Sequence, residues 1–180
     1  MSRRITLISN LDQSELKKID KLMTDIKIKT CKVPYGIDDE HRYDIDNLPY
    51  HFTIFATNKE NQDEFIDLIK TVNVDKIKLK INKVEIMNGK YDSYVLYLGI
   101  EDNQDLKELQ KLFYQKFSKE HYNPENFIFH MTLHIDKDYK IIKTLQSKIL
   151  EKFEPFYLEF DEMVLYNYPG EEIQKFSLSN

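Results

Sequence analysis

The sequence is poor in the residues that define several classes of protein. It has one cysteine, Cys31, so neither an intrachain disulfide nor a cysteine-rich zinc site can form. With only 4 Gly and 5 Pro in 180 residues, collagen-like and low-complexity chains are excluded. No apolar run approaches the ~20 residues of a membrane-spanning helix, and the opening MSRRITLISN lacks the apolar region of a signal peptide. We therefore expect a cytoplasmic protein without a membrane partner.

The charge balance argues against a broad basic surface. The formal net charge is −5, with 26 Lys and Arg interspersed among 31 Asp and Glu. A long nucleic acid is therefore a poor partner, whereas a nucleotide or short oligonucleotide held by a few local contacts is compatible with this balance. The hydrophobic content of 41% and the aromatic content of 13% are sufficient for a folded core in a chain of this length.

Hydrophobic periodicity predicts alternating strands and helices along the whole chain. The predicted helices span about 12–28, 58–72, 103–118 and 138–152. The predicted strands span 4–10, about 50–57, 76–87, 94–100, about 127–135, 156–166 and 173–179. Residues 31–49 have no sustained period and contain Pro, Gly and Asp, which predicts a long loop.

Two of the predicted strands carry the same motif, His-x-Thr. The segment LPYHFTIF contains His51 and Thr53, and FIFHMTLH contains His130 and Thr132. Residues two apart on a strand point to the same face, so each His shares a face with its Thr. The chain thus offers two imidazoles and two hydroxyls on two similar strands.

The motifs belong to a longer internal repeat. His51 and His130 are 79 residues apart, and each motif is followed by a helix, a strand, a hairpin turn and a strand. At the same offset, apolar residues coincide in three further pairs, which are Ile81 with Phe160, Val84 with Met163 and Ile86 with Leu165. This predicts two similar lobes related by a pseudo-twofold axis, with both His-x-Thr pairs facing one cleft.

Paired histidines and hydroxyls suit phosphodiester chemistry. Transfer of a phosphoryl group between oxygens requires removal of one proton from the nucleophile and delivery of another to the leaving oxygen. Imidazole, with an ordinary pKa of about 6.5, performs either task near neutral pH. Threonine hydroxyls can donate hydrogen bonds to the non-bridging oxygens. This chemistry requires no metal and no other cofactor, and the sequence leaves the acid and base roles exchangeable.

In its paired HFTI and HMTL motifs and its order of elements, the chain resembles the 2H phosphoesterase superfamily. That superfamily includes the 2′-5′ RNA ligase-like proteins and cyclic nucleotide phosphodiesterases. The resemblance implies an α+β fold in a single bilobal domain over residues 1–180. Two antiparallel sheets would face a central cleft, with helices on the outside. It also implies that His51 and His130 are catalytic and that Thr53 and Thr132 bind phosphate.

The substrates implied by the resemblance are 2′,3′-cyclic phosphates, 2′-5′ linkages and cyclic phosphates of the ADP-ribose type. The bacterial members that act on RNA often have a basic residue shortly after the second motif. Here the motif continues as HIDKD, with Ile135 and Asp136 in those positions. The nucleotide chemistry is therefore better supported by the sequence than RNA as the substrate.

Further candidates lie near the motifs. His134 is four residues after His130 on the same predicted strand, so we expect it on the same face, as a residue lining the cleft, a metal ligand with His130, or a structural histidine. Other candidates for contact with a base or a phosphate are the loop residues Tyr35, Arg42 and Tyr43 and the turn residue Tyr168.

The sequence therefore predicts a metal-independent, monomeric phosphodiesterase that hydrolyses a small cyclic-phosphate or 2′-5′-linked nucleotide or short RNA. Three alternatives remain open at this point. The cleft could bind a nucleotide or an RNA end without turnover, or it could ligate RNA. The chain could also be a metal-dependent hydrolase using His130, His134 and a carboxylate.

Overall fold

A computed structural model describes residues 4–24, 50–89, 92–117, 127–167 and 170–178. Its elements, in chain order, are β1 (Arg4–Asn10), α1 (Gln13–Thr24), β2 (Thr53–Asn58), η3 (Lys59–Asn61), α2 (Gln62–Thr71), β3 (Ile77–Asn88), β4 (Tyr94–Ile100), α3 (Gln104–Phe117), β5 (His130–Asp136), α4 (Tyr139–Leu150), β6 (Phe156–Phe160), β7 (Glu162–Asn167) and β8 (Glu172–Ser177). The predicted loop 31–49, with Tyr35, Arg42 and Tyr43, lies outside the described residues, as does Tyr168.

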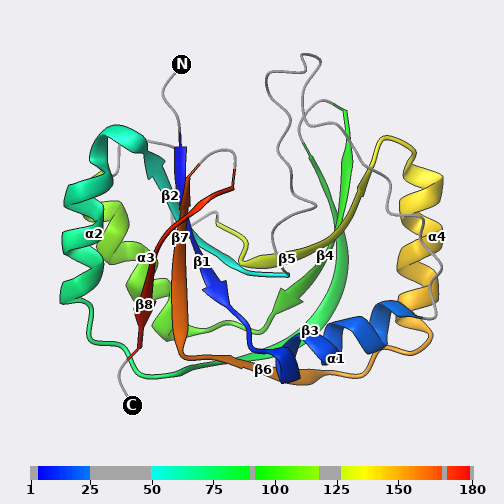
Figure 1. Ribbon diagram of the computed structural model, residues 1–180. Coiled ribbons are helices and arrows are strands. Elements are labelled where there is room, and N and C mark those ends of the chain that lie inside the picture. Colours follow the sequence, from blue (N-terminus) through cyan, green and yellow to red (C-terminus); the bar gives the residue numbers. More distant parts are fainter. Residues whose placement is uncertain (1–3, 25–49, 90–91, 118–126, 168–169, 179–180) are drawn as a thin grey trace.

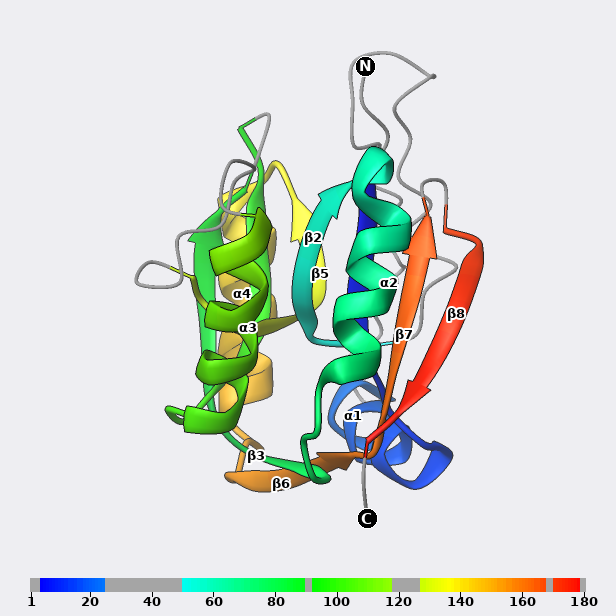
Figure 2. The same cartoon turned by 90° about the vertical axis from the view of Figure 1, so that its left-hand side faces the viewer.

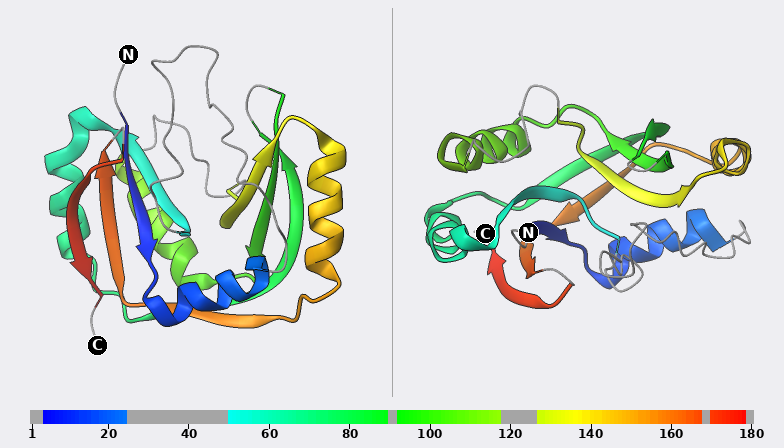
Figure 3. Two further views of the ribbon diagram at one scale, coloured as in Figure 1. Left: turned by 45° about the vertical axis from the view of Figure 1, so that its right-hand side comes forward. Right: turned by 90° about the horizontal axis from the view of Figure 1, so that it is seen from above.

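The strands form two antiparallel sheets of four strands each. The first sheet has the order β2-β1-β7-β8, and the second has the order β5-β4-β3-β6. The two sheets face each other across the middle of the molecule, with α2 and α4 on the outer sides (Figures 1 and 3). The α+β architecture with two facing antiparallel sheets is thereby confirmed. None of the described helices is both long enough and apolar enough to span a membrane.

One predicted strand is wrong in an informative way. Residues 156–166 do not form one strand, because the chain bends at Asp161 and divides into β6 and β7. β6 pairs with β3 in the second sheet, whereas β7 pairs with β1 and β8 in the first. The apolar pattern continues through both strands, because each strand buries one face. The chain bends because it leaves the second sheet and enters the first.

Four phenylalanines form the centre of the core on the side of the first sheet. Phe65 of α2 lies 5.1 Å from Phe113 and 5.4 Å from Phe117 of α3, between ring centroids, in edge-to-face geometry. Phe55 of β2 lies 5.7 Å from both Phe65 and Phe113. These contacts hold α2 and α3 side by side over the sheet that contains β2 (Figure 2). The position of the first motif strand therefore depends on this aromatic cluster.

The pairing of β3 with β6 shows where the internal symmetry axis lies. Leu79 pairs with Leu158, Ile77 with Phe160 and Ile81 with Phe156. Leu79 and Leu158 are 79 residues apart, the same offset that separates the two His-x-Thr motifs. When two equivalent segments pair antiparallel, the pair formed by matching positions marks the local twofold axis. The axis passes through Leu79 and Leu158, whose side chains are both 0% exposed.

The strand registers show that the symmetry extends to both sheets. They also show that each repeat begins one strand and one helix before its motif strand. In the first sheet, Leu7 pairs with Phe55 and Leu165. In the second, the equivalent residue is Leu96, which pairs with His134 and Ile86. β1 is thus the counterpart of β4, and the repeated unit is strand, helix, motif strand, helix, strand. β8, at the outer edge of the first sheet, has no counterpart among the described strands.

We expect Phe65→Ala to lower the free energy of unfolding by about 3–5 kcal/mol, because it removes a buried ring that contacts both α3 and β2. The measurement is equilibrium denaturation in urea. Leu112→Ala is the matched control, since Leu112 lies on the outer face of α3 and is 38% exposed; its expected effect is below about 1 kcal/mol. Equal losses in the two variants would contradict this assignment of the core.

Candidate active site

Both His-x-Thr segments lie at the edges of their sheets. β2 is the edge strand of the first sheet, and β5 is the edge strand of the second. His51 precedes β2, where the Ser9 amide donates to the Phe52 carbonyl at 2.9 Å and the Phe52 amide donates to Ser9 Oγ at 2.9 Å. These bonds continue the pairing beyond the end of the strand, so the segment at His51 remains attached to β1. The motif strands begin later than predicted, at Thr53 and His130.

Burial alternates along each motif, as expected for a strand with one face in the core. Phe52 and Met131, the residues between each His and Thr, are both 0% exposed in the hydrophobic core. His51, Thr53, His130 and Thr132 are all half-buried. Each His therefore shares with its Thr the face that points away from the core. Figure 3 shows that β2 and β5 lie opposite each other.

A β-bulge follows the threonine in both motifs. In the first sheet, Ile8 pairs with Thr53 and Leu7 with Phe55, so the pairing skips Ile54. In the second sheet, Tyr97 pairs with Thr132 and Leu96 with His134, so the pairing skips Leu133, the residue equivalent to Ile54. Each inserted residue reverses the alternation of faces beyond it.

The bulge overturns the predicted position of His134. Paired residues in a sheet share a face, and neighbouring residues on a regular strand do not. Since Leu96 and Tyr97 are neighbours on β4, their partners His134 and Thr132 point to opposite faces. His134 does not share the face of His130 and is 7% exposed. The expectation that His134 shares the face of His130 is therefore wrong, and with it the geometric reason for placing His134 in the cleft.

The same geometry removes the basis for a metal site built on His130 and His134, because the two imidazoles lie on opposite faces of β5. Asp136 is the acidic neighbour of His134, with 3.8 Å between Asp136 Oδ2 and His134 Nε2. Burial lowers the pKa of His134, and the Asp136 carboxylate opposes that change. Among the residues that the structure describes, no group of three or more His, Cys, Asp and Glu side chains could hold a metal ion.

His130 is held in a defined orientation. Its Nδ1 lies 2.7 Å from the Ile128 carbonyl oxygen. A carbonyl only accepts hydrogen bonds, so Nδ1 carries the proton and Nε2 of the neutral ring is left as an acceptor. The Tyr97 ring packs edge-to-face on the imidazole, with 5.5 Å between centroids. Burial lowers the pKa of His130, with a smaller opposing effect from the bond to Ile128.

Tyr97 and Glu85 extend the motif face of the second sheet. Glu85 pairs with Tyr97, which pairs with Thr132, and the Tyr97 hydroxyl donates to the Glu85 carboxylate at 2.9 Å. Burial, followed by the bond and the charge of Glu85, raises the pKa of Tyr97 to about 12. The equivalent row of the first sheet is apolar except for its threonine and consists of Val164, Ile8 and Thr53. Tyr97 and Glu85 are not evident as site residues from the sequence, because their positions follow only from the register of the β3–β4 hairpin.

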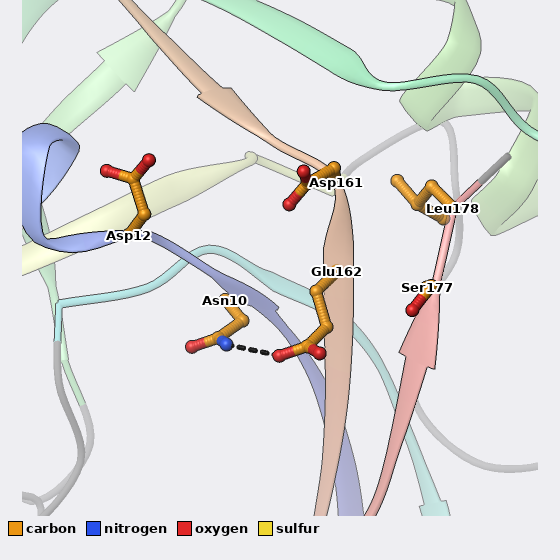
Figure 4. Close-up of a pocket in the computed structure, with 6 residues that line it drawn as sticks. All are labelled: Asn10, Asp12, Asp161, Glu162, Ser177 and Leu178. Carbon is orange, nitrogen blue, oxygen red and sulfur yellow. Dashed lines mark hydrogen bonds between the residues drawn. The ribbon is translucent and has the colours of Figure 1, made fainter. Parts of the chain in front are cut away.

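A cavity of about 340 Å³ lies at the ends of β1, β7 and β8, apart from the polar row of the second sheet (Figure 4). It is lined by Asn10, Asp12, Asp161, Glu162, Ser177 and Leu178. Asn10 donates from its side-chain amide to Glu162. Three carboxylates in one cavity repel a phosphate group, so this cavity does not fit the anionic ligand that the two motifs would bind.

The family profile for the 2′-5′ RNA ligase superfamily matches residues 19–172. Among solved structures, LigT of E. coli in complex with 3′-AMP matches with a TM-score of 0.65 at 12% identity, covering 100% of both chains. Usb1 of Kluyveromyces marxianus matches with a TM-score of 0.50 at 10% identity, covering 98% of this chain and 99% of that one. Among curated protein sequences, no match is found. The chain belongs to the 2′-5′ RNA ligase superfamily and has the fold of the 2H phosphoesterases.

We expect His134→Phe to weaken the loss of stability at acid pH. Because the pKa of His134 is lowered in the folded state, the unfolded chain binds a proton more readily as the pH falls through about 6.5. Wild type therefore loses stability as the pH falls, and the variant, which carries the residue of the equivalent position Phe55, loses less. The measurement is urea denaturation at pH 7.5 and pH 5. An unchanged difference between the two pH values would contradict burial of a neutral His134.

Proposed function

We propose that this chain is a phosphodiesterase that hydrolyses a small cyclic-phosphate or 2′-5′-linked nucleotide by acid–base catalysis with His51 and His130. The observation that carries the proposal is the equivalence of the two motifs. Both precede a bulge at the same position, on edge strands that lie opposite each other. Two imidazoles on opposite sides of one phosphorus can serve as base and acid in the same displacement.

The surroundings of His130 favour it as the general base. Its lowered pKa keeps the ring neutral at pH 7, and the bond from Nδ1 to Ile128 leaves Nε2 as the acceptor. Nε2 of His130 takes a proton from water as the water oxygen forms a bond to phosphorus. The bond from phosphorus to the ribose oxygen breaks, and His51 donates a proton to that oxygen. The hydroxyls of Thr53 and Thr132 donate hydrogen bonds to the non-bridging oxygens.

The proposed substrate is a nucleotide or a short oligonucleotide rather than long RNA. The net charge of −5 and the acidic cavity of the first sheet both disfavour a long polyanion. The similar LigT structures were solved with 3′-AMP, NADP+ and ATP, all of nucleotide size. We further propose that residues 1–180 act as one bilobal, monomeric, cytoplasmic unit, without a metal or other cofactor. RNA ligation would use the same two groups but requires a longer polyanion.

The first test is turnover in EDTA of 2′,3′-cyclic nucleotides, 2′-5′ and 3′-5′ dinucleotides and a cyclic phosphate of ADP-ribose. We expect His51→Ala and His130→Ala each to lower kcat by about 10²–10⁴-fold, because each removes one proton transfer. His134→Phe is the matched control and keeps kcat within about 3-fold, since His134 lies on the other face. If wild type binds these compounds without turnover, the chain is a binding protein and the proposal fails.

The pH dependence of kcat/KM tests the role of His130. A base with a lowered pKa stays unprotonated below the ordinary value of about 6.5. We therefore expect kcat/KM to fall on the acid side with an inflection below 6.5, and the fall to be absent from the residual activity of His130→Ala. An acid inflection at or above 6.5, or one that persists in His130→Ala, would assign the base elsewhere.

A further inference from the structure

A second row of paired residues crosses the second sheet beside the row of Tyr97. Lys83 of β3 pairs with Gly99 of β4, and Gly99 pairs with His130 of β5. Because paired residues share a face, Lys83 lies on the same face as the catalytic imidazole. The residue between them has no side chain, so nothing from Gly99 separates Lys83 from His130.

A bulge directs Lys83 across this gap. The pairing of β3 with β4 skips Asn82, the residue immediately before Lys83. A Cβ placed on Gly99 would lie 3.1 Å from Cβ and 3.4 Å from Cδ of Lys83. The stem of Lys83 therefore lies over Gly99, along the row that ends at His130. Bulges next to functional sites often redirect a side chain, and a glycine within a strand often marks such a close approach.

The charge of Lys83 is not neutralised within the described part of the protein. Two other lysines of β3 form ion pairs, Lys80 with Glu101 at 3.1 Å and Lys78 with Glu159 at 3.5 Å. Lys83 is exposed, and among the described residues no carboxylate lies within ion-pair distance of its ammonium group. A free ammonium group is thus available to an anion on the face of His130.

The first sheet differs at the equivalent positions. The row of Lys83 and Gly99 corresponds there to Glu162 and Asn10, which are also paired. Glu162 accepts a hydrogen bond from Asn10 and lies 3.7 Å from Lys175, between Oε1 and Nζ. The repeat has kept the histidines, but the second sheet has a lysine at the position where the first sheet has a glutamate. The two rows therefore carry charges of opposite sign, each with a neighbour of the other sign, since Glu85 lies two residues from Lys83 on β3 and Lys175 lies beside Glu162.

We propose that Lys83 is a substrate-binding residue that pairs with the non-bridging phosphate oxygens of the nucleotide beside His130. The inference rests on the proposed function. It adds that Lys83 attracts the anionic phosphate and determines on which side of the site the phosphate oxygens lie. Gly99 permits the contact, since a Cβ there would crowd the stem of Lys83 at 3.1 Å. Phosphate in both the diester substrate and the monoester product carries the required charge.

Kinetics on a hydrolysed cyclic nucleotide test the contact. We expect Lys83→Met, which keeps the stem and removes the charge, to lower kcat/KM about 10-fold or more, as for loss of a hydrogen bond to a charged group. Lys83→Arg, which keeps the charge, retains most of the wild-type kcat/KM. Wild-type kcat/KM falls with added NaCl more steeply than that of Lys83→Met. Lys111→Met, an exposed lysine of α3, controls for net charge and leaves kcat/KM and its salt dependence unchanged.

Calorimetric binding of 3′-AMP separates this inference from the proposed function, because it needs no turnover. We expect Lys83→Met to weaken binding about 10-fold and Gly99→Ala to weaken it less, with Lys83→Arg and Lys111→Met close to wild type. If wild type binds 3′-AMP but hydrolyses nothing, the inference stands while the proposed function fails. If Lys83→Met binds as wild type does, or if wild type does not bind 3′-AMP at millimolar concentration, the inference is overturned.

Discussion

The antiparallel pairing of β3 with β6 is the interaction on which the rest of the structure depends. It is centred on the buried pair Leu79 and Leu158 and joins the last strand of one repeat to the last strand of the other. Everything else in each half is built outward from those strands, through β4 or β1, to the motif strands at the edges. Because the two halves extend from one axis with equal registers, the two His-x-Thr segments occupy matching positions.

Local patterns predicted much of this architecture. The helices, both motifs and their repeat were evident from apolar spacing, and α3 and α4 lie within a residue or two of their predicted bounds. The errors arose where pairing with a distant strand decides geometry. The chain bends at Asp161 because β6 and β7 belong to different sheets. His134 points to the opposite face from Thr132 because of a bulge in the pairing of β5 with β4. No window of sequence around either residue contains the partner strand.

The repeat also shows how two equivalent histidines can acquire different roles. Their strands, registers and bulges match, but the residues around them have diverged. At equivalent positions the residues of the two sheets differ. The second sheet has Lys83, Gly99, Glu85, Tyr97 and His134 where the first has Glu162, Asn10, Val164, Ile8 and Phe55, respectively. The second sheet thus surrounds its histidine with a lysine, a glutamate and the tyrosine that donates to this glutamate, while the first presents apolar side chains, an asparagine and a glutamate. Acid–base specialisation requires such a difference in environment.

The bulges after the two threonines have a consequence for self-association. β2 and β5 are the edge strands of the described sheets, and an edge strand can pair with a strand from another molecule. A regular ladder requires donors and acceptors that repeat every two residues, and one inserted residue in each motif strand breaks that repeat. The distortion that separates Thr132 from His134 therefore also disfavours intermolecular β-sheet formation along these strands. Deleting Ile54 or Leu133 to regularise a strand would favour aggregation as well as reposition the residues that follow.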